Sequence, residues 1–183
     1  METDVHDRVR KSFEVIFEKP CWSVQQGHGS FLTFEFGEPY LDVWEQKPDR
    51  SINSKKFRKR KITIKGEWHL WIYCCHWNLT LDGDLLAHSE SSRGDIKNAL
   101  EHIDGEKLVR VSVNPQAGES EFEFELGGKL KTVPYERTSH RDEYDESWMF
   151  FEPDGNVLVY RGDGKYRWHS SSRSSEPTEQ IWL

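Results

Sequence analysis

Residues 68–77, WHLWIYCCHW, dominate the fold prediction for this chain. Nearly every position is apolar or aromatic, whereas a strand with one solvated face alternates apolar with polar residues. The run therefore predicts one central strand of a sheet, with both of its faces covered. Successive residues of a strand point to opposite faces, which gives two sets: Trp68, Leu70 and Ile72 on one face, and His69, Trp71 and Tyr73 on the other.

The composition indicates a folded chain with long polar loops. Of the 183 residues, 35% are hydrophobic and 31% are charged, a balance that also occurs in disordered chains. The eight tryptophans, six tyrosines and ten phenylalanines favour a folded core, because aromatic rings bury much surface per residue. The length suits one domain. We place it at residues 1–169, followed by a polar tail at 170–183 whose Ile-Trp-Leu end could dock back.

The net charge of −7 weighs against two classes of partner. Phosphate backbones and anionic lipids repel an acidic protein, so neither nucleic acid nor a membrane surface is an expected partner. A basic protein is favoured, although the charge can also serve solubility alone.

The three cysteines predict a reduced, cytoplasmic protein. Cys21, Cys74 and Cys75 are odd in number and two are adjacent, which makes a poor disulfide framework. The first residues have no apolar signal core, and no run is long enough to span a bilayer. Free thiols of this kind are typical of the cytoplasm.

Hydrophobic periodicity predicts two helices and ten to twelve short strands. Apolar residues three and four apart mark helices at residues 4–18 and 92–103. Alternation marks the strands, with turns expected at Gly37-Glu38-Pro39 and Gly66: 21–26, 31–36, 40–46, 59–65, 67–75, 78–81, 108–113, 120–126, 129–135, 148–152, 157–161 and 165–168. Short connections imply antiparallel pairing. We therefore expect the α+β class: a large curved antiparallel sheet, in one or two layers, covered by two helices.

The register of one hairpin can be argued from its side chains. Residues 120–126 alternate without a break and meet Gly127-Gly128. A three-residue loop sets Leu126 opposite Leu130 and Glu125 opposite Lys131, which pairs like with like and opposite charges. We expect that longer loop, with a glycine in a left-handed bulge.

Two motifs invite a chemical interpretation and favour a structural one. Cys74, Cys75 and His76 could ligate zinc, but no CxxC is present and thiols on an apolar strand are typically inert core residues. Gly27-His28-Gly29-Ser30 resembles an anion-binding loop, but a strand follows it and no helix dipole faces it. We interpret it as a turn.

The charged runs are expected to be solvated. Glutamates alternate at 119, 121, 123 and 125, which predicts a wet strand face rather than an acid–base pair. Residues 55–61 hold six basic side chains around Phe57. We expect a solvated loop that neutralises acidic stretches, with phosphate contact as the alternative.

The aromatic residues are the strongest candidates for a binding site. The tryptophans are too many to assign to one core, and a group of them could line a groove. The residues expected to contact a partner or ligand are His28, His69, Trp71, Tyr73 and Trp77. We predict no catalytic residue, no metal and no cofactor.

Several segments together resemble a family of small, uncharacterised bacterial proteins, some encoded on mobile integron cassettes. The similar features follow an N-terminal helix: Trp22, GHGSFLT at 27–33, FGEP at 36–39, GEWHLWI at 66–72, Cys75, Trp77, the helix at 92–103, Gly105, Trp148 and PDG at 153–155. The likeness covers most of the chain. It implies a bacterial cytoplasmic protein without a known cofactor, similar in build to immunity proteins, which neutralise toxins.

Two functions from different classes follow. The first, which we favour, is non-enzymatic binding of another protein, a basic one, as an immunity-like module. The second is a small-ligand-binding protein or enzyme with an aromatic pocket under the sheet. A pocket with converging polar groups would favour the second function, and a filled core with flat outer faces the first.

Overall fold

A computed structural model describes residues 2–45, 59–136 and 144–170 of the chain. These residues form two α-helices, one 3₁₀ turn and eleven strands. In chain order the elements are α1 (Glu2–Phe13), the 3₁₀ turn η1 (Glu14–Ile16), β1 (Cys21–Gln26), β2 (Leu32–Glu45), β3 (Arg60–Ile72), β4 (Cys75–Leu81), β5 (Asp84–His88), α2 (Arg93–Ile103), β6 (Leu108–Asn114), β7 (Glu119–Phe124), β8 (Gly128–Pro134), β9 (Glu146–Phe151), β10 (Asn156–Arg161) and β11 (Tyr166–Ser170).

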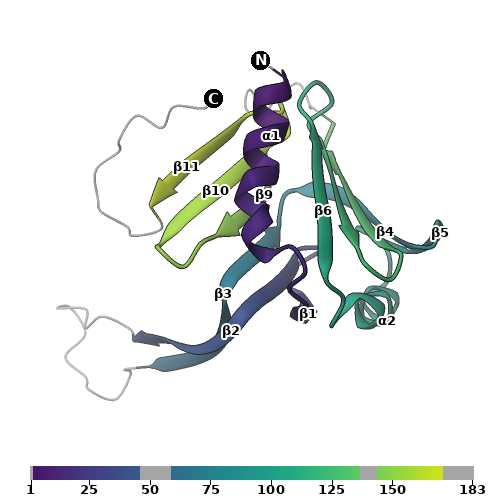
Figure 1. The fold of residues 1–183 in the computed structure, drawn as a ribbon. Helices are drawn as coiled ribbons and strands as arrows, with labels where there is room; N and C mark the ends of the chain where they lie inside the picture. Colours follow the sequence, from purple (N-terminus) through teal and green to yellow (C-terminus); the bar gives the residue numbers. More distant parts are fainter. Residues whose placement is uncertain (1, 46–58, 137–143, 171–183) are drawn as a thin grey trace, which may run out of the picture.

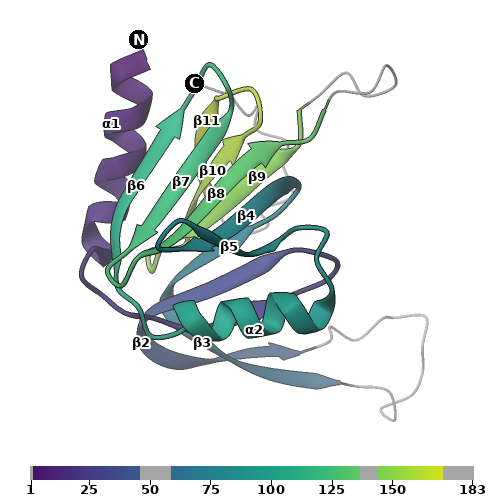
Figure 2. The same ribbon diagram turned by 90° about the vertical axis from the view of Figure 1, so that its right-hand side faces the viewer.

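The strands form two antiparallel sheets (Figure 1). One sheet has six strands in the order β1-β2-β3-β9-β10-β11, and the other has five in the order β5-β4-β8-β7-β6. Helix α1 packs against β6, and α2 packs against β1 and β5, so the helices lie on different sides of the molecule (Figure 2). The predicted α+β class and antiparallel pairing are confirmed.

The decisive run at 68–77 is two strands rather than one. Strand β3 ends at Ile72 and β4 begins at Cys75, so the intervening residues carry the chain from one sheet to the other. Leu70, Ile72 and Trp77 are buried, whereas His69 and Trp71 are half-buried. The prediction of a single strand covered on both faces is therefore wrong. The run reads as continuously apolar because its outer face carries aromatic rings that cover one another.

One hydrophobic core joins the two sheets and α1. Trp148 of β9 is fully buried, and its Nε1 donates to Ser120 Oγ of β7 at 2.8 Å. Its ring stacks on Tyr160 at 5.2 Å and meets Phe13 and Phe122 edge-on at 5.6 and 6.0 Å. The space beneath the six-stranded sheet is thus filled by side chains.

A bend in β2 and β3 shapes the outer face of the six-stranded sheet. The register slips between Phe36 and Pro39, and Gly37 has a φ of +78°. Opposite this bulge, a Cβ on Gly66 would lie 2.4 Å from the carbonyl oxygen of Phe36. The glycines therefore permit a close backbone approach inside two long strands. The turns predicted at Gly37-Glu38-Pro39 and Gly66, with separate strands on either side, are wrong.

Beyond the bend, β2 and β3 continue as a two-stranded arm (Figure 1). One face of the arm is aliphatic, since Leu41 pairs with Ile64 and Val43 with Ile62, and all four side chains are 49–63% exposed. The opposite face carries the cross-strand pair Tyr40 and Lys65.

The β7–β8 hairpin has the predicted loop but a different register. Three residues separate the strands, and Gly127 has a φ of +96°. However, Lys131 lies opposite Glu121 rather than Glu125. Residues 125 and 126 leave the ladder because their N–H groups donate to Lys107 O and to the buried Glu106 carboxylate. The predicted register, with Leu126 opposite Leu130 and Glu125 opposite Lys131, is therefore wrong, because Leu130 pairs with Phe122; the actual register also pairs opposite charges.

The glutamate stripe at 119–125 is an ion-paired strand face. Lys131 contacts Glu119 at 2.9 Å, and Lys129 lies 3.8 Å from Glu121 and 3.7 Å from Glu123. The solvated face is thus confirmed. This stripe gives no support to a basic partner, which stays a prediction.

Other local predictions have mixed outcomes. Helix α2 begins after Ser92, whose Oγ accepts from the N–H of Asp95, as expected of a capping box. The first helix ends earlier than predicted, at Phe13, with η1 after it. The predictions for residues 46–58, most of the basic run, and for the tail after 170 lie outside the described residues. No helix among the described residues is long and apolar enough to cross a membrane; the cytoplasmic location stays a prediction.

Candidate functional site

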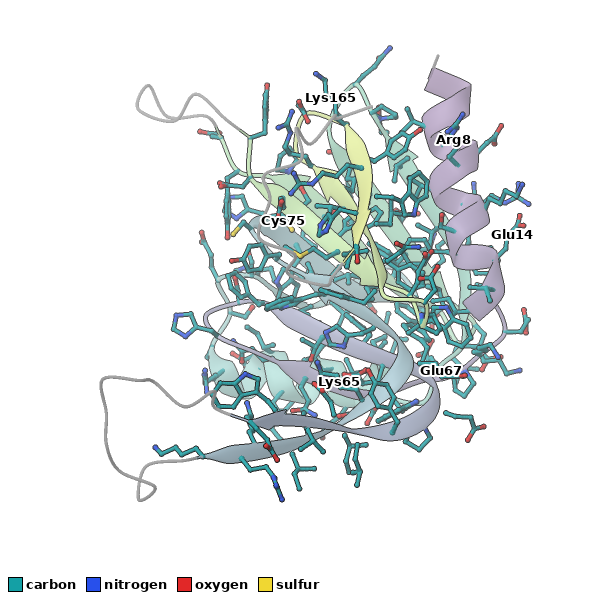
Figure 3. The ribbon with its side chains drawn as sticks, turned by 90° about the vertical axis from the view of Figure 1, so that its left-hand side faces the viewer. Arg8, Glu14, Lys65, Glu67, Cys75 and Lys165 are labelled. Carbon is teal, nitrogen blue, oxygen red and sulfur yellow. The ribbon has the colours of Figure 1, made fainter. Side chains whose placement is uncertain are left out.

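The candidate site is a pocket of about 550 Å³ on the outer face of the six-stranded sheet. It lies where β3 bends away from β9 and the β9–β10 turn, and Figure 3 shows Lys65 and Glu67 at this bend. The lining residues are Tyr40, Lys65, Gly66, Glu67, His69, Trp71, Phe151, Glu152, Pro153 and Gly155. Its volume is within the range of small-molecule sites.

A buried carboxylate fixes His69 at the pocket wall. Glu35 lies directly opposite His69 in the β2–β3 pairing and is only 6% exposed. Its Oε1 is 2.7 Å from His69 Nδ1, and its Oε2 accepts from the N–H of Gly66 at 2.9 Å. Because an ionised carboxylate only accepts, the proton of this bond belongs on Nδ1. The ring's Nε2, which has no hydrogen bond within the described part of the chain, is then an acceptor for a ligand.

Aromatic rings form a continuous row along this outer face. His69 and Trp71 lie 5.5 and 6.4 Å from Phe151, which comes from the neighbouring strand β9. The row continues from Trp71 to Tyr73 at 5.2 Å and from Tyr73 to Phe31 at 4.4 Å. Rings at these separations pack favourably, so the row makes a preformed apolar platform.

Trp71 adds an unsatisfied donor to this platform. Its Nε1 is buried, and among the described residues it has no hydrogen-bond acceptor. A buried donor without an acceptor costs about 1–3 kcal/mol. A ligand oxygen that reached this atom would recover that energy.

Negative charge dominates the polar wall of the pocket. Glu67 and Glu152 line it, and within the described residues neither forms an ion pair. Lys65, the cation in the lining, already pairs with Asp42 at 2.8 Å. Burial, and secondarily the charge of Asp154, raises the pKa of Glu152 above its ordinary value. The pocket therefore combines aromatic walls with two carboxylates that have no counter-ion in the described part of the chain.

The structure brings together four of the five predicted site residues. His69 and Trp71 line the pocket, Tyr73 extends the ring row, and His28 lies at its far end, 6.4 Å from Phe31. Trp77 does not belong to the site: it is 1% exposed and its Nε1 donates to Ser30 O at 2.7 Å. Trp77 lies on β4 with its side chain in the core, and its hydrogen bond to Ser30 holds the 27–30 turn against the core.

The pocket also differs from the prediction in its position and in its other residues. It lies on the outer face of the sheet, since the space beneath the sheet is core. Sequence reasoning missed Glu35, Glu67, Phe151 and Glu152. Glu35 carried a weak signal, because it is the polar member of the alternating Phe34-Glu35-Phe36 strand.

A second groove, of about 560 Å³, lies between β1 and α2. It is lined by Val24, Gln25, Gln26, Arg93, Gly94, Lys97, Leu100, Glu101 and Asp104. It has no aromatic wall, and its Lys97 faces Glu101 at 3.8 Å on the exposed side of the helix. This mixed, largely open surface does not select a ligand class.

The cysteines are core residues, with one exception. Cys21 and Cys75 are fully buried and donate to the carbonyls of Ile103 and Ser147 at 3.1 and 3.3 Å. Cys74 is half-buried, so the expectation that both adjacent thiols are sealed is wrong for Cys74. Across residues 2–45, 59–136 and 144–170 there is no cluster of three metal-ligating side chains.

These environments predict unequal thiol reactivity. We expect a thiol-specific reagent to modify Cys74 at least about 100-fold faster than Cys75, which must wait for local opening. Burial also raises the pKa of Cys75 far above its ordinary value and that of Cys21 to about 12, so little thiolate forms at either position. Fragmentation mass spectrometry of the labelled peptide distinguishes the neighbours. Equal labelling of Cys74 and Cys75 would contradict the structure.

Removing the Glu35 carboxylate should destabilise the fold. Glu35→Ala leaves two donors, at His69 and Gly66, without an acceptor, and we expect a loss of about 3 kcal/mol in the free energy of unfolding. Glu35→Gln, which keeps one acceptor oxygen, should cost less. Glu45→Ala is the control, because its pair with Arg60 is exposed and should contribute under about 1 kcal/mol. Urea unfolding measures the stability of all three variants. Equal losses of unfolding free energy for Glu35→Ala and Glu45→Ala would contradict the buried hydrogen bonds of Glu35 to His69 and Gly66.

Comparison of the chain with family models, with curated proteins and with solved structures gives no match. The resemblance to uncharacterised bacterial proteins therefore stays a prediction.

Proposed function

We propose that this chain is a small-molecule-binding protein whose ligand occupies the pocket between the β2–β3 bend and the β9–β10 turn. The observation that carries the proposal is the convergence, around about 550 Å³, of aromatic rings with a histidine held by a buried carboxylate. Sites for small ligands combine apolar walls with a few fixed polar groups in this way.

Preorganisation supports the proposal. The cross-strand pair Glu35–His69 and the ring contacts of Phe151 hold the wall in place without a ligand. A ligand then loses little binding energy in ordering the site.

We also infer that the two sheets are two layers of one body, closed at their open sides by the helices. Phe13 of α1 reaches into the shared core, where it stacks on Phe150 at 4.2 Å, and the buried face of α2 joins the same core. In this arrangement the helices occupy the sides (Figures 1 and 2), and the outer face of β3, where His69 and Trp71 line the pocket, is left uncovered by them.

A fragment screen followed by nuclear magnetic resonance tests the proposed function. A library of neutral, cationic and anionic fragments is added to the full chain, and shifts of the Trp71 indole N–H and the His69 ring are followed. We expect at least one class of fragment to shift these signals saturably. If no fragment of any class does so, the proposed function is wrong.

Two exposed aromatics on the same face of β2 provide matched variants. Tyr40 lines the pocket and is 50% exposed, whereas Trp44 lies further along the arm and is 56% exposed. Tyr40→Ala should weaken binding about 3- to 10-fold, and Trp44→Ala should leave it unchanged. The reverse order would place the ligand on the arm instead.

Binding of a basic protein, as an immunity-like module, is the second candidate function. The unpaired carboxylates of Glu67 and Glu152 favour it, because a lysine or arginine side chain of a partner could enter the same pocket. Charge complementarity of this kind directs protein association. The two candidate functions differ in what enters the pocket, a free small molecule or a side chain of a partner protein. The experiments in the next subsection distinguish them.

A further inference from the structure

We infer that the pocket selects an organic cation, a primary or quaternary ammonium group carried on a small apolar body. This inference rests on the proposed function, since it names the chemistry of the ligand at the same site. Three features of the described residues support it: the carboxylates of the pocket, its aromatic rings, and the ion pair that Lys65 already forms with Asp42.

The carboxylates leave an uncompensated negative potential inside the pocket. Glu67 Oε2 accepts from the backbone N–H of Glu38 at 3.1 Å, a bond that orients the carboxylate without neutralising it. Glu152 has no ion-pair partner within the described segments. Low-dielectric walls concentrate such a potential, so a cation gains more here than at the exposed surface.

The aromatic walls add a second preference for positive charge. Tyr40, Trp71 and Phe151 present ring surfaces to the same volume. A cation over an aromatic face gains about 0.5–2 kcal/mol, and clusters of rings are the usual site for quaternary ammonium groups.

An anionic ligand could accept a hydrogen bond from Trp71 Nε1, but among the described residues that line the pocket it would meet no lysine or arginine without an ion pair. The ammonium of Lys65 lies 2.8 Å from Asp42 Oδ2, so its charge is already balanced. A carboxylate or phosphate ligand would have to share this ammonium with Asp42 and would lie beside Glu67 and Glu152. Repulsion between like charges opposes that arrangement.

Three small molecules of the same shape test the charge preference. Choline, its neutral isostere 3,3-dimethylbutan-1-ol and the anion 3,3-dimethylbutanoate are titrated into the full chain, with the Trp71 indole N–H as the signal. We expect choline to bind at least about tenfold more tightly than the alcohol, and the anion not to saturate. Equal affinity for choline and the alcohol, or tighter binding of the anion, would overturn the inference.

The failure of this inference is distinguishable from failure of the proposed function. If neutral or anionic fragments from the screen shift Trp71 and His69 while choline does not, the pocket binds ligands but not cations. If no fragment shifts these signals, the pocket is not a ligand site at all.

Charge-removing variants locate the binding to the pocket. Glu152→Gln is nearly isosteric and should reduce choline affinity about tenfold. Glu90→Gln removes the same charge from an exposed position in the β5–α2 turn and should change affinity less than twofold. Equal effects of the two variants would mean that choline responds only to net charge, which would overturn the inference.

A fourth titration distinguishes a free small ligand from the side chain of a partner protein. N-acetyl-lysine methylamide presents the lysine ammonium of a basic partner, and choline presents a free small cation. Tighter binding of choline supports a small-molecule ligand, and tighter binding of the lysine derivative supports a basic protein. Either result supports a cation in the pocket, and binding of neither overturns it.

Acid should weaken the binding of choline. The cation favours ionised Glu152, whose pKa is raised in the free protein, so affinity should fall as the pH drops through that raised pKa. Other charged or titratable groups face the same volume or the same turn: Tyr40, Lys65, Glu67, His69 and Asp154. Protonation of His69 acts in the same direction, so the part due to Glu152 is the difference between the profiles of the wild type and Glu152→Gln. Affinity that rises toward low pH would contradict the inference.

Discussion

Replacing Trp148 by alanine is expected to lower the free energy of unfolding by about 4 kcal/mol. The side chain is fully buried between the two sheets. It contacts Phe13 of α1, Phe122 of β7 and Tyr160 of β10, and it donates a hydrogen bond to Ser120 at 2.8 Å. The variant would leave a large cavity, and the Ser120 hydroxyl would lose its donor, at a place where residues of α1 and of both sheets meet.

Two further variants make this prediction specific. Trp148→Phe keeps most of the ring volume but loses the bond to Ser120, so it should cost about 1–2 kcal/mol. Trp168→Ala removes a side chain of the same kind that is 38% exposed on β11, and should cost well under half as much as Trp148→Ala. Urea unfolding with an unchanged m-value measures each loss. If Trp168→Ala lowered the free energy of unfolding as much as Trp148→Ala, the burial of Trp148 between the two sheets would be contradicted.

Sequence patterns predicted correctly the elements that depend on residues close together in the chain. The α2 helix follows from apolar residues three and four apart, and the β7–β8 hairpin follows from the alternation that leads into Gly127-Gly128. The turn formers Pro-Asp-Gly at 153–155 lie between the predicted strands 148–152 and 157–161, where the structure has the β9–β10 turn. Each of these features depends on residues within a few positions of one another.

The passage from β3 to β4 could not be predicted because no local signal marks it. Tyr73 and Cys74 are neither turn formers nor glycines, and the apolar run continues through them. The outer residues His69 and Trp71 look like core residues in sequence. Both are aromatic, and Phe151, from a strand more than seventy positions away, packs on their rings.

The part of the candidate site that lies on a single strand could be predicted, and the part that depends on pairing between distant strands could not. His69, Trp71 and Tyr73 could be grouped, since alternation places them on one strand face. Glu35 and Glu152 could not, because Glu35 lies opposite His69 only through the β2–β3 pairing, and Glu152 joins the same pocket only through the β3–β9 pairing of the preceding Phe151. Pairing register between distant strands depends on the bulge at Phe36–Pro39, and sequence alone gives no rule for where that slip occurs.

Gly66→Ala should both destabilise the fold and impair the pocket. The new Cβ would lie 2.4 Å from the carbonyl oxygen and 2.8 Å from the nitrogen of Phe36. These are backbone atoms in a paired strand, so no side-chain movement can relieve the contact, and we expect a loss of about 2–3 kcal/mol. Separation of the strands at this point would also disturb the Gly66 N–H that donates to Glu35 and the bend beside which Tyr40 lines the pocket.

Gly94→Ala is the matched control, because the nearest atom to its added Cβ is Ser92 Oγ at 3.7 Å and the residue lies in the first turn of α2. Alanine favours a helix, so this variant should gain up to about 1 kcal/mol. Choline or any ligand found in the screen should bind at least about tenfold more weakly to a folded Gly66→Ala protein and equally well to Gly94→Ala. A Gly66→Ala protein with unchanged stability would mean that Phe36 does not approach Gly66 closely. Unchanged affinity in a destabilised variant would mean that the bend does not shape the site.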